Sequence, residues 1–113
     1  MKNPKWTRDE IILTLAFYHK YYPFIPEKSS NEIRDLSRLL RKLSETKNDS
    51  INPKYRNENG VYMKLMNFHH LNPNHFGKGL HAASKLDSEI FMEFENKLEN
   101  LNYLSEKLKE TLN

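Results

Sequence analysis

The regular spacing of the apolar residues limits the fold of this chain more than any other feature. They recur every three or four positions, from Ile33 to Leu43 and again from Phe91 to Leu112, as on one face of an α-helix. Prolines separate these helical segments, and they stand at Pro23, Pro26, Pro53 and Pro73. We therefore predict an all-α fold, with a three-helix, helix-turn-helix-like core followed by a long C-terminal helix.

Capping residues predict the limits of the first helix. Thr7 can cap its N-terminus, and Glu10 can close a capping box with it. The helix should end near Tyr21 or Tyr22, because a proline follows and disfavours a helical residue before it. Just ahead of this helix, Trp6 is expected to anchor in the core.

The next two helices are predicted in the same way. Residues 29–32 repeat the capping-box pattern ahead of a second helix that ends near Leu43. Residues 45–55 are rich in Lys, Asn, Asp and Ser and read as a loop. Asn57 should cap a third helix, from residue 58 to about residue 71, which a proline then ends.

The last helix is predicted over about residues 85–112, capped by Ser84 or Asp87. An apolar seam follows its three-four spacing, broken only by Ser105, and its members are Phe91, Phe94, Leu98, Leu101, Leu108 and Leu112. The first half should pack on the three earlier helices. The second half could run free, pair with a copy of itself, or connect to a further domain.

Length and composition set the class of protein. A chain of 113 residues fits one domain, residues 1–113, with a core of moderate size, and its three glycines suit helices better than sheets. The sequence has no cysteine, which excludes a disulfide framework, a thiolate nucleophile and a Cys-based zinc site. Its longest apolar run, residues 11–17, is too short to span a bilayer, so we expect a cytoplasmic protein with no membrane partner.

Charge is unevenly distributed along the chain. From Ser84 onward there are four Lys and seven acidic residues, 4 − 7 = −3, and the first 83 residues hold 14 basic and eight acidic residues, 14 − 8 = +6. A basic part with an acidic tail is typical of a domain that meets a polyanion on one side. The alternative is an ordinary lysine-rich surface from an AT-rich genome, which the thirteen Lys and thirteen Asn would also fit.

The segment from Asn52 to Leu71 carries the pattern of a recognition helix. A proline-broken basic loop leads into a helix whose core-facing residues are Val61, Leu65 and Phe68. We expect a partner to reach the remaining face, which carries Tyr62, Lys64, Asn67 and His70. The aromatic loop at residues 21–26 either forms a second wall beside this helix or folds back as a lid over the core.

Catalytic chemistry finds little support in the sequence. The carboxylates are scattered over helix faces, without a recognisable pair for acid–base work. His69 and His70 are adjacent on one helix and point about 100° apart, so both cannot easily bind one metal ion. We therefore expect no catalytic residue, no metal site and no cofactor on this chain.

Several short motifs also resemble known families. At the level of the fold, Trp6-Thr7 with Glu10, a Leu-rich second helix and a basic turn resemble a Myb-type three-helix unit. Over roughly residues 6–95 the order of motifs is similar to the N-terminal domain of bacterial McrA-like, HNH-type restriction endonucleases. These motifs are Trp6-Thr-Arg-Asp-Glu, Asp35-Leu-Ser-Arg-Leu-Leu, Tyr55-Arg-Asn-Glu-Asn-Gly-Val-Tyr-Met-Lys-Leu-Met-Asn-Phe, Leu71-Asn-Pro, Gly79-Leu and Ser84-Lys-Leu-Asp. Phe is the more familiar residue at Tyr55 and Asp at Asn72, which leaves the specificity open.

This resemblance implies a DNA-binding module for a type IV-like restriction system. Such enzymes cut DNA that carries methylated or hydroxymethylated cytosine or a phosphorothioate linkage, and a separate nuclease domain does the cutting. The implied partners are double-stranded, modified DNA and a nuclease domain fused or in trans. The alternative is a protein-interaction or regulatory DNA-binding module that forms a homodimer through its C-terminal helix.

Two sets of residues are the candidates for DNA contact under this reading. The phosphate contacts, which set affinity and register, are expected from Lys42, Lys54, Arg56, Lys64 and Lys78. Contacts to base edges, or to a pocket for the modification, are expected from Tyr22, Tyr55, Asn57, Asn59, Tyr62, Asn67 and His70. An apolar recess could discriminate a methyl group or a sulfur atom, because a polar atom placed there would lose its hydration without gaining a partner.

Overall fold

The computed structural model describes residues 4–45, 54–75 and 83–112. In these residues the chain forms helices and no strand: α1 (Arg8–Tyr21), α2 (Asn31–Glu45), α3 (Glu58–Leu71), the short 3-10 helix η1 (Pro73–His75), α4 (Lys85–Glu93) and α5 (Leu98–Leu112). The predicted all-α class and a long C-terminal helix are confirmed. Among the described helices, none has the length and apolar character needed to cross a membrane.

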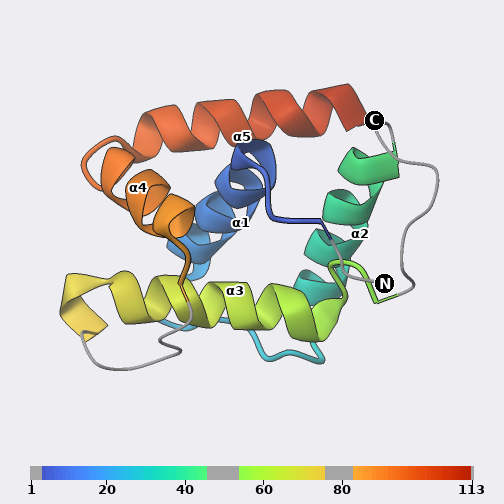
Figure 1. Ribbon diagram of the computed structural model, residues 1–113, viewed down its shortest axis with the longest axis horizontal. Helices are drawn as coiled ribbons and strands as arrows, with labels where there is room; N and C mark the ends of the chain where they lie inside the picture. The colour runs from blue at the N-terminus through green and yellow to red at the C-terminus, as the bar shows by residue number, and fades with distance from the viewer. Residues whose placement is uncertain (1–3, 46–53, 76–82, 113) are drawn as a thin grey trace.

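Helix α1 lies at the centre of the molecule (Figure 1) and packs against each of the other four α-helices. In this view α5 runs across the top and α3 across the bottom, while α2 lies to the right of α1 and α4 to its left. Residues 10–16 of α1 are all buried, as expected of a helix that is apolar on every side. The only hydroxyl in that run, on Thr14, donates to the Glu10 carbonyl at 2.9 Å.

The helix ends follow the predicted capping residues with one shift. Thr7 and Glu10 form the predicted capping box, and α1 ends at Tyr21. The predicted capping box at residues 29–32 is wrong by one position, because the Ser30 hydroxyl accepts the Ile33 N–H at 3.2 Å and α2 begins after it. The sequence pattern pairs Ser29 with Glu32, whereas the observed cap pairs Ser30 with the N–H of Ile33, which is buried.

The three-helix core consists of α1, α2 and α3, which contact one another in all three pairings. Residues 46–57 connect α2 to α3, a longer connection than the three or four residues of a helix-turn-helix turn. Asn57 caps α3 as predicted, and its Oδ1 accepts the Gly60 N–H at 2.8 Å. A Cβ at Gly60 would lie 3.3 Å from that oxygen, so the glycine gives the capping side chain room.

The prediction of one continuous helix over residues 85–112 is wrong. Ser84 caps α4 with Asp87 in a second capping box, and the helix ends at Glu93, after which the backbone turns at Phe94 (φ −102, ψ 5). A straight helix over residues 85–112 would be roughly 42 Å long, and its second half would leave the core. The turn at residues 94–97 instead buries the Phe94 ring and folds α5 back over α1.

Because α5 folds back over α1, its apolar seam packs inside the molecule. Leu101, Ser105 and Leu112 are the buried residues of α5, so Ser105, which seemed to break the seam, lies on its inner face. Its small side chain suits a position where α5 passes close to α1. Leu98, Tyr103 and Leu104 are the larger apolar residues of α5 that stay exposed.

Tyr18 ties the end of α3 to the central helix. Its ring is fully buried and contacts the rings of Phe68, His69 and Phe91. Its hydroxyl accepts a hydrogen bond from Asn72 Nδ2 at 3.1 Å and lies 2.9 Å from His69 Nδ1, to which it can donate. Burial raises the pKa of Tyr18 to about 12, so the hydroxyl keeps its proton for this bond.

We expect Tyr18→Phe to lower the free energy of unfolding by about 1–3 kcal/mol, because buried Asn72 and half-buried His69 lose their shared partner while the ring packing stays. Urea denaturation measures the change. Tyr103→Phe on α5 is the matched control, since its exposed hydroxyl should matter by less than about 0.5 kcal/mol. Equal losses in both variants would contradict this role for the Tyr18 hydroxyl.

Candidate nucleic-acid interface

Helix α3, the predicted recognition helix, presents a largely uncharged outer face. Asn59, Tyr62, Met63, Met66 and His70 are accessible and share one side of the helix by their spacing, and half-buried Glu58 stands in its first turn. The expectation that a partner could reach Lys64 and Asn67 is wrong, because each is only 7% exposed. Both point into the protein, and Asn67 Oδ1 has no hydrogen-bond partner within the described residues.

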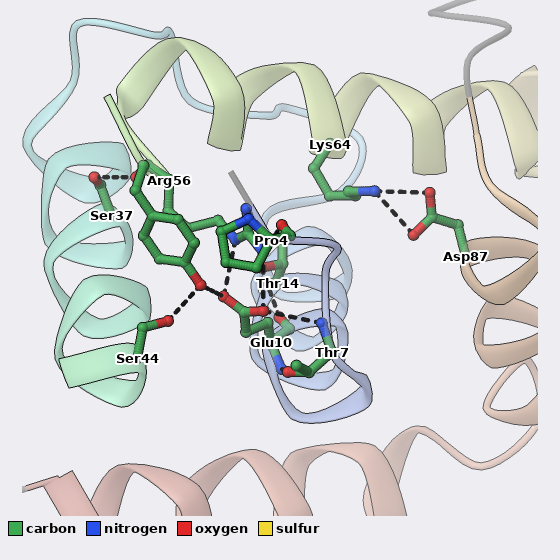
Figure 2. A network of polar contacts seen from close by, with 10 residues as sticks. Pro4, Thr7, Glu10, Thr14, Ser37, Ser44, Arg56, Lys64 and Asp87 are labelled. Atoms are coloured by element: carbon green, nitrogen blue, oxygen red, sulfur yellow. Dashed lines mark hydrogen bonds and ion pairs between the residues drawn. The ribbon is translucent and has the colours of Figure 1, made fainter. Parts of the chain in front are cut away.

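Arg56, predicted as a phosphate contact, is buried in an ion pair with Glu10 (Figure 2). Its Nε donates to Glu10 Oε2 at 2.8 Å and its Nη2 to Glu10 Oε1 at 3.1 Å. The same Nη2 also donates to the Pro4 carbonyl at 3.0 Å. The two charged side chains are only 4% and 2% exposed, so the guanidinium serves the interior and is not available to a phosphate.

Tyr55, predicted for the modification pocket, belongs to the same network. Its hydroxyl donates to Glu10 Oε2 at 2.6 Å and is itself hydrogen-bonded to Ser44 of α2. The Thr7 N–H donates to the other Glu10 oxygen at 2.9 Å. One carboxylate therefore joins the N-terminal arm, α1, the end of α2 and the segment before α3.

Arg56 also has an uncommon backbone conformation, with φ at 47° in the left-handed region. The Ser37 hydroxyl of α2 donates to its carbonyl at 2.6 Å, and the Asn57 N–H donates to the Lys54 carbonyl at 3.2 Å. These bonds hold a tight turn over residues 54–57, which sets the start of α3. A non-glycine residue keeps such a conformation only where its surroundings fix it, and here the ion pair does so.

A second buried ion pair fixes the other flank of α3. Lys64 Nζ lies 2.8 and 3.0 Å from the carboxylate oxygens of Asp87 on α4. Between the two pairs lies the Trp6 ring, with Arg56 Cζ 4.4 Å and Lys64 Nζ 4.9 Å from its centre. Trp6 is half-buried against the core, as predicted for an anchor, and it covers both cations.

The other predicted contact residues are distributed over the surface as follows. Lys42 and Lys54 are exposed, and Asn59 is exposed with its Oδ1 3.3 Å from Lys28 Nζ. Tyr22, Asn57, Tyr62 and His70 are half-buried. Tyr22 and Tyr62 pack against the core cluster. Asn57 uses its side-chain oxygen for the cap of α3. Lys78 lies outside the described residues.

The structure points to a basic edge on α2 that the predicted contact residues included only through Lys42. Arg34, Arg38 and Arg41 recur at intervals of four and three and so share one face, on which Arg34 and Arg38 are exposed. This face adjoins the turn that carries Lys54, because Ser37 and Ser44 of α2 bond to residues 55 and 56. We call this set the basic edge: Lys28, Arg34, Arg38, Arg41, Lys42 and Lys54.

Acidic groups reduce the charge of the basic edge only in part. Asp35 lies 3.6 Å from Arg38, with both side chains about 70% exposed, so this pair is well hydrated and contributes little attraction. Glu58 opens α3 beside Lys28 and Asn57, around a shallow hollow of about 350 Å³. The spacing of the arginines was visible in the sequence, but their neighbourhood with residue 54 depends on the fold.

Metal chemistry has no site in the described part of the chain. No three His, Asp or Glu side chains among those residues gather closely enough to bind an ion. His69 and His70 diverge on α3, and His69 Nδ1 is held by the Tyr18 hydroxyl.

The Glu10 network makes stability depend on pH. Burial by itself would raise the pKa of the Glu10 carboxyl, but hydrogen bonds from Arg56, Tyr55 and the Thr7 N–H outweigh it and lower the pKa below the ordinary 4.5. A lowered pKa stabilises the folded state at pH values above 4.5, and that contribution is lost as the pH falls through the folded-state pKa. Burial also lowers the pKa of His19 below its ordinary 6.5, which adds a loss that begins at higher pH.

We expect Glu10→Gln to lower the free energy of unfolding at neutral pH by about 3–5 kcal/mol, because it leaves Arg56 buried without a counter-charge. Its unfolding free energy should also lack the part of the acid-induced decline that begins near pH 4.5, while the decline due to His19 remains. Urea denaturation across a pH series measures both effects.

Glu93→Gln is the matched control for this prediction. Glu93 forms a two-bond pair with Arg8 at 2.6 Å, but both side chains are more than 40% exposed, so its loss should change stability by about 1 kcal/mol or less. If the two variants lose similar stability, the Glu10 ion pair does not have the structural role assigned to it.

Comparisons of the chain with protein-family models, with curated proteins and with solved structures find no match. The resemblance to the N-terminal domain of McrA-like restriction endonucleases therefore stays a prediction drawn from the order of short motifs. Function has to be argued from the surface of this molecule and its charges.

Proposed function

We propose that this chain binds duplex DNA through the basic edge and the outer face of α3. The observation that carries the proposal is the position of Lys28, Arg34, Arg38 and Lys42, which are exposed cations on elements that flank the start of α3. Residues 1–83 hold an excess of six positive charges, 14 − 8 = +6, and residues 84–113 an excess of three negative charges, 4 − 7 = −3. Such asymmetry orients a protein on a polyanion.

The two surfaces would divide the work of binding. Lysine and arginine side chains of the basic edge contact phosphates, which sets affinity and position without reading sequence. The side chains of α3 that remain accessible, Asn59 and His70 foremost, are suited to hydrogen bonds with base edges. Lys42, Lys54, Asn59 and His70 thus keep their proposed contacts, while the burial of Arg56, Lys64, Tyr55 and Asn67 removes theirs.

The finer part of the proposal is that the DNA is modified. The motif order of the McrA-like enzymes supports it, and so does the aromatic segment at residues 21–26, which lies beside α3 and offers apolar surface for a methyl group or sulfur atom. In a type IV-like restriction system the chain would be the reading module, acting in the cytoplasm, with a nuclease domain fused to it or supplied in trans.

We expect the triple variant Arg34→Gln, Arg38→Gln, Lys42→Gln to bind duplex DNA more weakly and with a shallower salt dependence. Three lost phosphate contacts should reduce the slope of log K against log salt by about 3. Fluorescence anisotropy between about 50 and 200 mM salt measures both quantities. The matched control removes the same charge from outside the basic edge, in the segment from α4 to α5: Lys85→Gln, Lys97→Gln, Lys107→Gln.

Equal losses in the two triple variants would show only nonspecific attraction to net charge and would contradict a defined interface on α2. The same titration, repeated with cytosine-methylated, hydroxymethylated and phosphorothioate duplexes, tests the finer proposal. We expect one modification to be bound at least about tenfold more tightly than unmodified DNA, a difference of about 1.4 kcal/mol. Equal affinity for all four duplexes would remove the modification from the proposal.

Self-association through α5 is the second candidate function, and a specific observation favours it. Leu98, Tyr103 and Leu104 are exposed on α5, and Leu98 borders a groove of about 510 Å³ between α1, α2 and α5. Most of the apolar seam is already used internally, which leaves less of it for a partner. Sedimentation of the wild type and of Tyr103→Ala over a range of concentrations distinguishes a dimer from a monomer.

A further inference from the structure

Phe24 is the most exposed large apolar residue in the described part of the chain, at 85%. It lies between α1 and α2, in the segment from Tyr22 to Ser30. Single exposed apolar residues are common on protein surfaces, so exposure alone assigns no role. A role requires that the backbone keep this ring at a defined position and that a binding surface lie next to it.

The backbone around Phe24 is fixed by hydrogen bonds and prolines. Its N–H donates to the Tyr21 carbonyl at 2.8 Å, two residues after the Tyr22 N–H has closed the last turn of α1. Pro23 precedes it and Pro26 follows two residues later, which limits φ on both sides. These features fix the backbone at Phe24, whose side chain lies outside the molecule.

Apolar residues close to Phe24 on both sides are partly covered by the core, but Phe24 itself is not. Tyr22 and Ile25 are half-buried and pack against the core cluster, while Phe24 between them stays outside. Burying an aromatic ring is worth several kcal/mol, and this chain leaves that gain unused at one fixed position. A held, exposed ring loses little conformational entropy when a partner covers it.

The segment lies against α3 on the proposed DNA face (Figure 1). Near one end the Tyr22 ring lies 6.3 Å from the His69 ring, and toward the other end Lys28 Nζ lies 3.3 Å from Asn59 Oδ1. The segment therefore runs beside the outer face of α3, where Met63 is 44% exposed. Lys20 and Lys28 flank the segment with positive charge, and Glu27 is its one acid.

We propose that Phe24 inserts as a wedge between neighbouring base pairs of the bound duplex. An apolar ring that enters a base step gains stacking on the base faces and kinks the helix, and cations beside it hold the flanking phosphates. Phe24 supplies the ring, and Lys28 supplies a cation four residues away. This inference rests on the proposed DNA-binding function and assigns Phe24 as a residue that positions the DNA and selects deformable steps.

The test uses the full chain and duplexes, unmodified and cytosine-methylated, that carry 2-aminopurine at successive positions. Wild type should raise the fluorescence of 2-aminopurine at one step, because unstacking relieves its quenching. Phe24→Ala should abolish that rise and weaken binding by about tenfold or more, the usual effect of losing one aromatic–base stack. Phe24→Trp should keep both the rise and the affinity.

Two controls separate this role from others. Met92→Ala removes an exposed apolar side chain from α4 and should change neither readout. Phe24→Ala should melt like wild type, since the ring is in water, and its salt slope should be unchanged because no phosphate contact is lost. A wild-type dimer that Phe24→Ala converts to a monomer would overturn the wedge and make Phe24 a contact between copies.

The wedge and the DNA-binding proposal fail in different ways. A wild-type chain that binds no duplex contradicts DNA binding itself, and the wedge falls with it. If wild type binds while Phe24→Ala binds equally well, or if no 2-aminopurine position responds, only the wedge is overturned.

Discussion

The ion pair between Glu10 and Arg56 is the interaction on which the rest of this structure depends. Removing two charges from water costs more than their attraction returns unless hydrogen bonds satisfy the remaining atoms. Here Tyr55, the Thr7 N–H and the Pro4 carbonyl supply those bonds. The pair therefore specifies a geometry more than it adds stability, since only one arrangement of these segments satisfies the carboxylate and the guanidinium together.

The position of α1 explains why so much of the fold could be predicted and why its centre could not. The apolar run of residues 11–17, the Thr7–Glu10 capping box and the proline after Tyr22 predict this helix nearly to the residue. Local patterns do not say how many sides of a helix will be covered, however. The fold-back of α5 covers α1, and it follows from the burial of Phe94, at a position with no glycine or proline to mark it.

The candidate site was predicted less well, because charge and spacing do not reveal which charged residues form buried ion pairs. Lys64 stands at the border of the apolar face of α3, where a long side chain can turn either outward or inward. Its partner Asp87 lies on another helix, and the sequence around Asp87 indicates only a possible cap. The direction of the Arg56 side chain is equally ambiguous in the sequence. Its left-handed backbone is set by contacts with Ser37 and Glu10 rather than by residues next to it in the sequence. Lys42 and Asn59 lie on the exposed surface, as expected.

These buried ion pairs determine which side chains of α3 remain available to a partner. The basic residues nearest α3 in the sequence are used to hold it, so the outer face of the helix is left with amide, aromatic, thioether and imidazole groups. Attraction to an anion must then come from a neighbouring element, and α2 carries exposed arginines beside the same turn. Under the proposed DNA binding, affinity depends on salt through α2, and discrimination among duplexes depends on the shape and apolar character of α3 and the loop beside it.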